Sequence, residues 1–226
     1  GTYFLENFNH LMESDLQYFQ AFKNSLVIAI VTTTLAMVVS SAAGYAFEVY
    51  KSKARDRVFN IVLLSMMVPF AALMVPLFRL FGKFNDGLNT SGSVVIIAVA
   101  TAFLIFFFRQ NTKTFPKELI EASRIDGLGE FKIFTRIYMP TMKSTYAAAI
   151  VVTFMTSWNN YLWPLIALQS EEKRTLPLVI SAMGSSYTPD YGMMMTAVVL
   201  ATLPTAILFF VMQKQFVAGM TGSVKG

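Results

Sequence analysis

The stretch SLVIAIVTTTLAMVVSSAAGYAF, from Ser25 to Phe47, decides the fold class of this chain. It carries no charge and exceeds the roughly 20 mainly apolar residues that an α-helix needs to cross a membrane. Four later stretches share this character, and none of the five contains Asp, Glu, Lys, Arg or His. They are residues 58–78, 92–108, 144–168 and 193–212. The sequence therefore predicts an all-α, polytopic transmembrane helix bundle with five spans.

The overall composition agrees with a membrane bundle. Hydrophobic residues make up 55% of the 226 residues and charged residues 14%, whereas a soluble domain carries about 25% charged residues. The absence of cysteine excludes disulfides, thiolate metal sites and a cysteine nucleophile. The single histidine, His10, lies in a polar stretch where we expect it to be solvated. We therefore predict no catalytic residue, no metal site and no cofactor in this chain.

The basic residues are distributed unevenly between the two expected sides of the membrane. Most of them follow the first and third spans or lie in the C-terminal tail. By the positive-inside rule, the connection between the third and fourth spans and the C-terminus are cytoplasmic. This explains the net charge of +5 without a nucleic-acid partner. It also makes residues 1–24 an external segment, and we expect a sixth helix upstream of Gly1.

The prolines of the spans allow two interpretations. Pro69, Pro76, Pro164 and Pro204 lie within or near the predicted spans. Proline removes a helix hydrogen bond, which neighbouring helices can compensate in a membrane protein. These prolines either give ordinary curvature or break helices that line a pathway.

Aromatic and amide residues gather near the end of the fourth span. We expect Trp163, close to the outer boundary, to anchor the span at the membrane interface. Trp158, Asn159, Asn160 and Tyr161 lie deeper, where an unpaired amide is costly. They either line the substrate pathway or form hydrogen bonds between helices.

The connection over residues 111–143 is too patterned for a passive linker. Pro116 stands where a first helical turn would begin, which suits proline. Leu119, Ala122 and Ile125 then recur at helical spacing. Gly127 and Gly129 are expected to break this helix, because glycine can adopt the left-handed conformation that ends helices.

A second short helix is expected after Gly129. Phe131, Phe134 and Ile137 would share one face, and Pro140 would end the helix. The two amphipathic helices either lie in the lipid interface or dock onto a cytoplasmic partner.

The residues of this loop resemble a family signature. The run from Glu121 to Gly127, followed by Phe134, Ile137 and Pro140, resembles the EAA loop of ABC-importer permeases, with Ser123 in place of the second alanine. Three further stretches are similar to carbohydrate-type permeases: Ser157–Leu165 (SWNNYLWPL), Thr175–Leu178 (TLPL) and residues 216–226. The chain thus resembles the smaller permease subunit of binding-protein-dependent, maltose-type carbohydrate importers.

This resemblance implies a type I ABC importer permease with six spans. Residues 25–217 would form the permease domain, with the coupling loop 111–143, and residues 218–226 would be a cytoplasmic tail. The loop would dock into a cleft of the ATPase subunit, and Lys225 and Gly226 would reach the same interface. The coupling residues would be Leu119, Glu121, Ala122, Ser123, Ile125, Asp126, Gly127, Phe134, Ile137 and Pro140.

The resemblance also implies partners and a substrate class. The partners would be a second, different permease, two ATPase subunits that bind ATP-Mg, and an external solute-binding protein, in a bacterial or archaeal cytoplasmic (inner) membrane. The chain itself lacks a phosphate-binding loop. The expected function is import of a sugar or oligosaccharide. The alternatives are a permease for another solute, a secondary transporter or channel, and a membrane-embedded enzyme; charge-free spans argue against the last two.

Overall fold

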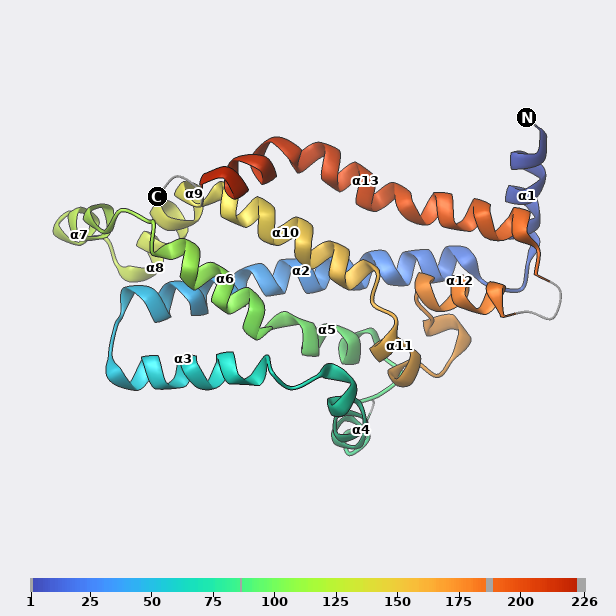
Figure 1. The fold of residues 1–226 in the computed structure, drawn as a ribbon, viewed down its shortest axis with the longest axis horizontal. Coiled ribbons are helices and arrows are strands. Elements are labelled where there is room, and N and C mark those ends of the chain that lie inside the picture. The colour runs from blue at the N-terminus through green and yellow to red at the C-terminus, as the bar shows by residue number, and fades with distance from the viewer. Residues whose placement is uncertain (1, 86, 186–188, 223–226) are drawn as a thin grey trace. The chain divides into compact units, whose positions relative to one another are not determined.

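The computed structural model describes residues 2–85, 87–185 and 189–222, and their regular structure is helical throughout (Figure 1). This confirms the all-α prediction. The predicted tail contacts Lys225 and Gly226 lie outside the described residues. The helices are α1 Thr2–Glu13, α2 Tyr18–Val49, α3 Lys53–Ser65, α4 Phe70–Phe81, α5 Ser91–Val99, α6 Ala102–Thr112, α7 Lys117–Ile125, α8 Glu130–Ile133, a π-helix Phe134–Tyr138, α9 Met139–Thr141, α10 Lys143–Trp158, α11 Leu162–Ala167, a 3₁₀ turn Glu171–Lys173, α12 Leu176–Gly184 and α13 Tyr191–Gly222.

Fewer helices are long enough to span a membrane than the sequence suggested. Among the described residues, three stretches qualify by length and apolar character: Tyr18–Val49, Ser91–Thr112 and Tyr191–Lys214. The expected span at 58–78 is a pair of helices, α3 and α4, broken before Phe70, and it makes a fourth span only if the pair is counted together. Pro69 is the N-cap of α4 with an extended backbone, so here proline accompanies a break.

The predicted continuous span at 144–168 is wrong. Helix α10 ends at Trp158, and α11 begins only at Leu162. Pro164 supplies the physical reason, because it has no N–H to donate to the carbonyl of residue 160 and its ring would clash there. In the first turn of α11 that missing donor costs nothing, since first-turn N–H groups have no helical partner.

The chain forms two compact units. Unit 1 comprises the described residues within 1–33, 69–98 and 153–210, and unit 2 comprises those within 34–68, 99–152 and 211–226. Each has its own buried core: the core of unit 1 gathers around Leu11, Trp158 and Leu176, and that of unit 2 around Phe108 and Tyr138.

Trp163 belongs to the interior of unit 1, so its predicted role as an interface anchor is wrong. The side chain is fully buried. Its indole N–H donates to the Ser93 carbonyl at 2.8 Å, and its ring meets those of Phe70 and Phe81. A tryptophan whose only polar group is satisfied inside the protein has no need of a membrane–water boundary.

Candidate functional site: the loop between α6 and α10

The first helix of the loop, α7, begins as the sequence predicts but packs through a different face. Pro116 is its N-cap. Ile120 and Ser123 are buried, and the Ser123 hydroxyl donates to the Leu119 carbonyl at 2.6 Å. By contrast Leu119 is 41% and Ile125 87% exposed. The predicted apolar face is therefore directed away from the protein.

A glycine turn ends α7. Gly127 has φ +79°, the left-handed conformation that the sequence predicted. Gly129, for which the same was expected, is instead the extended N-cap of α8. Its N–H donates to the Arg124 carbonyl, and the Leu128 N–H donates to the Ser123 carbonyl, both at 3.0 Å. These two bonds form a Schellman motif. Asp126 contributes its backbone N–H to Ala122 at 2.9 Å, while its side chain is exposed.

The second half of the loop does not end at Pro140, as the sequence suggested. Helix α8 continues through the π-helix Phe134–Tyr138 into α9, which contains Pro140 and ends at Thr141. In the π turn the Met139 N–H bonds to the Phe134 carbonyl, five residues back. This wider turn makes room for a proline that cannot donate.

The buried face of this second half also differs from the expected one. Ile133 and Tyr138 are fully buried, and Phe134 and Ile137 pack against the same core. Phe131, expected on the same face as Phe134 and Ile137, is 78% exposed.

An aromatic cluster fixes the loop to the rest of unit 2. The Tyr45 ring lies 4.7 Å from that of Tyr138 and 5.3 Å from that of Phe134, measured between centroids. The hydroxyls of Thr112 and Tyr138 are 2.6 Å apart. Burial raises the pKa of the Tyr138 phenol. Aromatic pairs at such distances add to the free energy of burial, so the base of the loop is firmly held.

A polar staple joins the two loop helices to the connection after α2. The Arg124 Nε lies 2.7 Å from a Glu130 oxygen, and the Tyr50 hydroxyl donates to the other Glu130 oxygen. The hydrogen bonds from Arg124 and Tyr50 lower the pKa of Glu130. Burial and the bond to Glu130 raise the pKa of Tyr50. The staple keeps Glu130 ionised and restricts the bend between α7 and α8.

The outer surface of the loop combines apolar and charged side chains. Leu119, Ile125 and Phe131 are exposed, and so are Glu121 and Asp126. We call these five residues the loop tip. Exposed apolar side chains surrounded by charge are typical of protein interaction sites. Figure 1 shows α7 and α8 as two short helices joined by a tight turn.

A small cavity of about 260 Å³ lies behind the tip. Glu121 and Arg124 of α7 line it, together with Glu48 and Lys51. Glu121 therefore belongs to the exposed tip and also lines this charged cavity.

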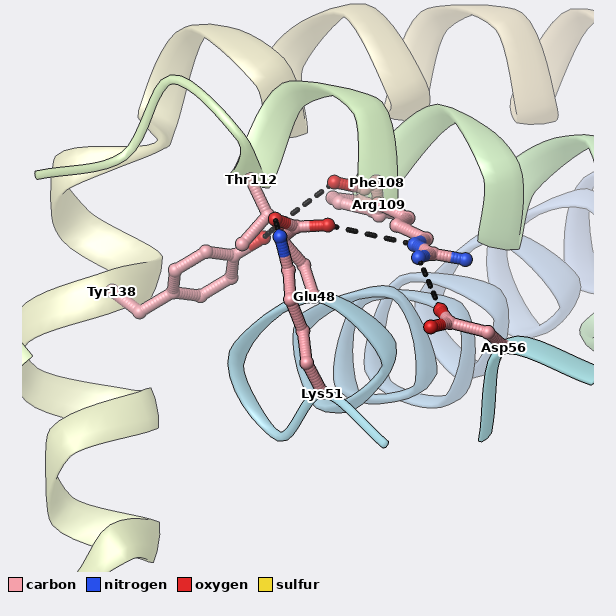
Figure 2. Close-up of polar contacts among 7 residues, drawn as sticks. All are labelled: Glu48, Lys51, Asp56, Phe108, Arg109, Thr112 and Tyr138. Atoms are coloured by element: carbon pink, nitrogen blue, oxygen red, sulfur yellow. Dashed lines mark hydrogen bonds and ion pairs between the residues drawn. The ribbon is translucent and has the colours of Figure 1, made fainter. Parts of the chain in front are cut away.

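Sequence reasoning missed an ionic cluster that lies beside the loop (Figure 2). Glu48 is buried and contacts Lys51 and Arg109, while Arg109 also contacts Asp56. The first and third predicted spans end at residues 47 and 108, so Glu48 and Arg109 each directly follow a predicted span. Two opposite charges that each directly follow an apolar run are a sequence signal from which the Glu48–Arg109 pair could have been predicted.

The residues predicted for a substrate pathway divide into two groups in unit 1. Trp158 is buried, and its indole N–H donates to the Ala201 carbonyl of α13 at 3.1 Å, which fits the helix-to-helix alternative. The Asn159 side-chain amide, one residue beyond the end of α10, donates to the Met155 carbonyl of that helix at 2.8 Å, and Asn160 is half-buried. Both Trp158 and Asn159 also border a cavity of about 490 Å³.

Tyr161 borders a second cavity of about 460 Å³. Gln169, Arg174 and Ser181 supply further polar groups, and Leu165 and Leu178 are among its apolar lining residues. The Ser181 hydroxyl donates to the Tyr161 hydroxyl at 3.3 Å. Apolar walls with a few converging polar groups are characteristic of small-molecule sites of this volume.

Solved structures place this fold among ABC importers. One neighbour is a bacterial ABC transporter involved in the import of the acidic polysaccharide alginate, with a TM-score of 0.83 at 20% identity over 93% of this chain and 79% of that one. The MetNI methionine ABC transporter gives a TM-score of 0.69 at 18% identity, over 89% of this chain and 95% of that one. At these identities the similarity establishes the fold alone.

Residues 36–222 match the family described as binding-protein-dependent transport system inner membrane component. The chain belongs to this family, and is therefore a multi-pass membrane component of a transport system rather than an enzyme. The lactose permease LacG of Rhizobium radiobacter is 55% identical over 90% of this chain and 74% of its own length. The arabinooligosaccharide permease AraQ of Bacillus subtilis (strain 168) is 41% identical over 98% of this chain and 79% of its own. The sn-glycerol-3-phosphate permease UgpE of Escherichia coli (strain K12) is 29% identical over 100% and 82%, respectively.

Proposed function

We propose that this chain forms half of the translocation pathway of a carbohydrate importer and couples it to a separate ATPase subunit through the loop tip. The observation that carries the proposal is the combination of a firmly anchored base with an exposed apolar tip. A rigid element of this kind can transmit the movement of a docked partner, which a flexible loop would absorb.

The contact with the ATPase subunit would have an apolar centre and a charged rim. Leu119, Ile125 and Phe131 would supply the centre, and Glu121 and Asp126 would pair with basic or polar groups of the partner. Ala122 lies on the same exposed side of α7. Ser123, Gly127, Phe134, Ile137 and Pro140 would act by shaping the loop, since they form its turn, its buried side or its helical continuation. ATP-Mg would be bound by the ATPase subunit, because this chain has no phosphate-binding loop.

The substrate would be a disaccharide or short oligosaccharide. Two relatives, at 55% and 41% identity, are named as permeases for lactose and arabinooligosaccharides. The cavity at Tyr161 suits such a solute, because sugars present C–H faces to apolar walls and hydroxyls to groups such as the Gln169 amide and the Arg174 guanidinium. The neighbouring cavity at Trp158 and Asn159 would continue the pathway.

The complete importer would contain a second, different permease, two ATPase subunits and an external solute-binding protein. The loop and the C-terminal tail would be cytoplasmic, in agreement with the excess of basic residues on that side. Lys225 and Gly226 would also contact the ATPase subunit.

ATP hydrolysis by the reconstituted importer tests this function. We expect binding protein loaded with lactose to stimulate ATP hydrolysis. Binding protein without sugar, or loaded with a sugar that it does not release to the importer, should stimulate hydrolysis much less. An ATPase that fails to associate with the permease pair would contradict the importer assignment. Stimulation by glycerol phosphate but not by any sugar would contradict the substrate class alone.

A further inference from the structure

Glu48 is an acid in an unfavourable place. It lies in the last turn of α2, where the helix dipole already concentrates negative charge, and its side chain is only 3% exposed. A buried carboxylate at this position requires cations close by. Lys51 Nζ lies 2.9 Å from one carboxylate oxygen and Arg109 Nε lies 3.5 Å from the other.

Arg109 joins three helices at one guanidinium. It belongs to the last turn of α6, contacts Glu48 of α2, and places Nη2 2.8 Å from the Asp56 carboxylate in the first turn of α3. Its guanidinium carbon also lies 4.0 Å from the centroid of the Phe59 ring. Figure 2 shows Arg109 between the two carboxylates. The planar guanidinium suits such multiple contacts, which a lysine could not reproduce.

The same turn of α6 holds the coupling loop. The Thr112 hydroxyl donates its single proton to the Phe108 carbonyl at 2.7 Å. The Tyr138 hydroxyl, 2.6 Å away, must therefore be the donor to Thr112 (Figure 2). The last turn of α6 therefore contacts the ionic cluster through Arg109 and the buried Tyr138 of the loop through Thr112.

We infer that Glu48 and Arg109 are positioning residues that transmit displacement of the coupling loop to α2 and α3. The inference rests on the proposed function and deepens it. A displacement of the loop reaches α6 through the hydrogen bond between Tyr138 and Thr112. The Arg109 guanidinium then transmits it to Glu48 and Asp56. Without the charge of Glu48, α6 can shift while α2 stays in place. Neither residue is one of the five loop-tip residues, and neither is among the lining residues of the cavity at Tyr161.

The test is the number of sugar molecules transported per ATP hydrolysed by the reconstituted importer. Glu48→Gln keeps the side-chain shape and removes the charge. We expect it to retain the ATPase subunit at the wild-type ratio and to lower the transport ratio about fivefold to tenfold. Lys51→Gln and Lys53→Gln form a matched pair of exposed positions, one in the connection between α2 and α3 and one at the start of α3. Only Lys51 is in contact with Glu48, so only its substitution should lower the ratio.

Adding Arg109→Gln to Glu48→Gln removes both buried charges and also the ion pair with Asp56. We therefore expect the double variant to recover assembled complex but not the transport ratio. A purely structural cluster would instead lower the yield of assembled complex and leave the transport ratio of the assembled fraction unchanged, which would overturn the inference. If Glu48→Gln fails to assemble, Lys51→Gln takes its place, because it removes an exposed cation that contacts Glu48 and leaves both buried charges intact. A wild-type transport ratio in assembled Lys51→Gln would likewise overturn the inference. If the wild-type importer shows no sugar-stimulated hydrolysis, the proposed function fails instead.

Discussion

The loop between α6 and α10 in unit 2 and the α11–α12 segment of unit 1 place their apolar and polar side chains in opposite ways. In the loop the aromatic and polar anchors, such as Tyr138 and Glu130, hold the base, and apolar Ile125 and Phe131 are exposed. In the α11–α12 segment the large apolar Trp163 is buried, and polar Tyr161 and Arg174 border a cavity. An exposed apolar surface suits a protein partner, whereas converging polar groups in a hollow suit a hydroxylated solute. The two regions should therefore respond to different substitutions.

The largest effect is expected at the loop tip. Ile125→Asp places a charge at the centre of the proposed interface, and removing such a central contact should weaken ATPase binding about 100-fold. The ATPase retained on the purified permease pair measures this. Lys113→Ala, an exposed change ahead of α7, is the control and should retain the ATPase. Full retention with Ile125→Asp would show that the tip is not the docking surface.

In the α11–α12 segment, Arg174→Gln should raise the KM for sugar about tenfold, because a hydrogen bond from a charged group is lost. ATPase retention should not change. Lys173→Gln removes an adjacent exposed charge that does not border the cavity, and its KM should stay at the wild-type value. Equal KM values for the two variants would argue that the cavity is not a sugar site.

The turn of the loop can be tested with two glycines that have equal space around them. A methyl group meets nothing within 4 Å at Gly127 or Gly129, but only Gly127 has a positive φ. Gly127→Ala should strain the turn by about 1–2 kcal/mol and weaken ATPase binding several-fold, while Gly129→Ala should have no such effect. Equal binding by both variants would show that the bend does not depend on the left-handed residue.

The parts that the sequence predicted are those governed by local chemistry. Helical periodicity places α7, and the need for a left-handed residue places the turn at Gly127. Periodicity does not say which side of a helix is buried, because α7 has apolar residues on more than one side. Leu119, Ala122 and Ile125 recur at a spacing of three, and Ile120 lies about 100° around the helix from Leu119. Only the three-dimensional packing selects Ile120 for the interior.

The remaining errors have a common cause, which is that apolar runs do not reveal where a chain breaks or what it packs against. Trp163 looks like an interface anchor until its partner Ser93, far away in sequence, is known. In the same way, Glu48 and Arg109 follow two apolar runs that the sequence alone does not bring together.

The smallest effect is expected from pH at the Glu130 staple. Bonds to Arg124 and Tyr50 lower the pKa of Glu130 from its usual 4.5. An acid with a lowered folded pKa stabilises the fold above its unfolded pKa, and this contribution is lost as pH falls through the folded value. The chain has no cysteine, so a spin label at Lys132→Cys can report loop mobility. In the wild-type protein we expect constant loop mobility from pH 8 to about 5 and an increase below about 4.5. In Glu130→Gln the loop should already be mobile at pH 8, and its mobility should not increase further as the pH falls. An identical pH profile in both proteins would show that the Glu130 staple does not restrict the loop.

The most direct test of the account is a photocrosslink from the two faces of α7 in the assembled importer. The photoreactive residue replaces either Ile125, which is 87% exposed, or Ile120, which is 3% exposed. We predict a crosslink to the ATPase subunit from position 125 and none from position 120. Crosslinks from position 125 to lipid alone, with the ATPase present and active, would show that the loop is an interfacial helix pair and would contradict the central claim.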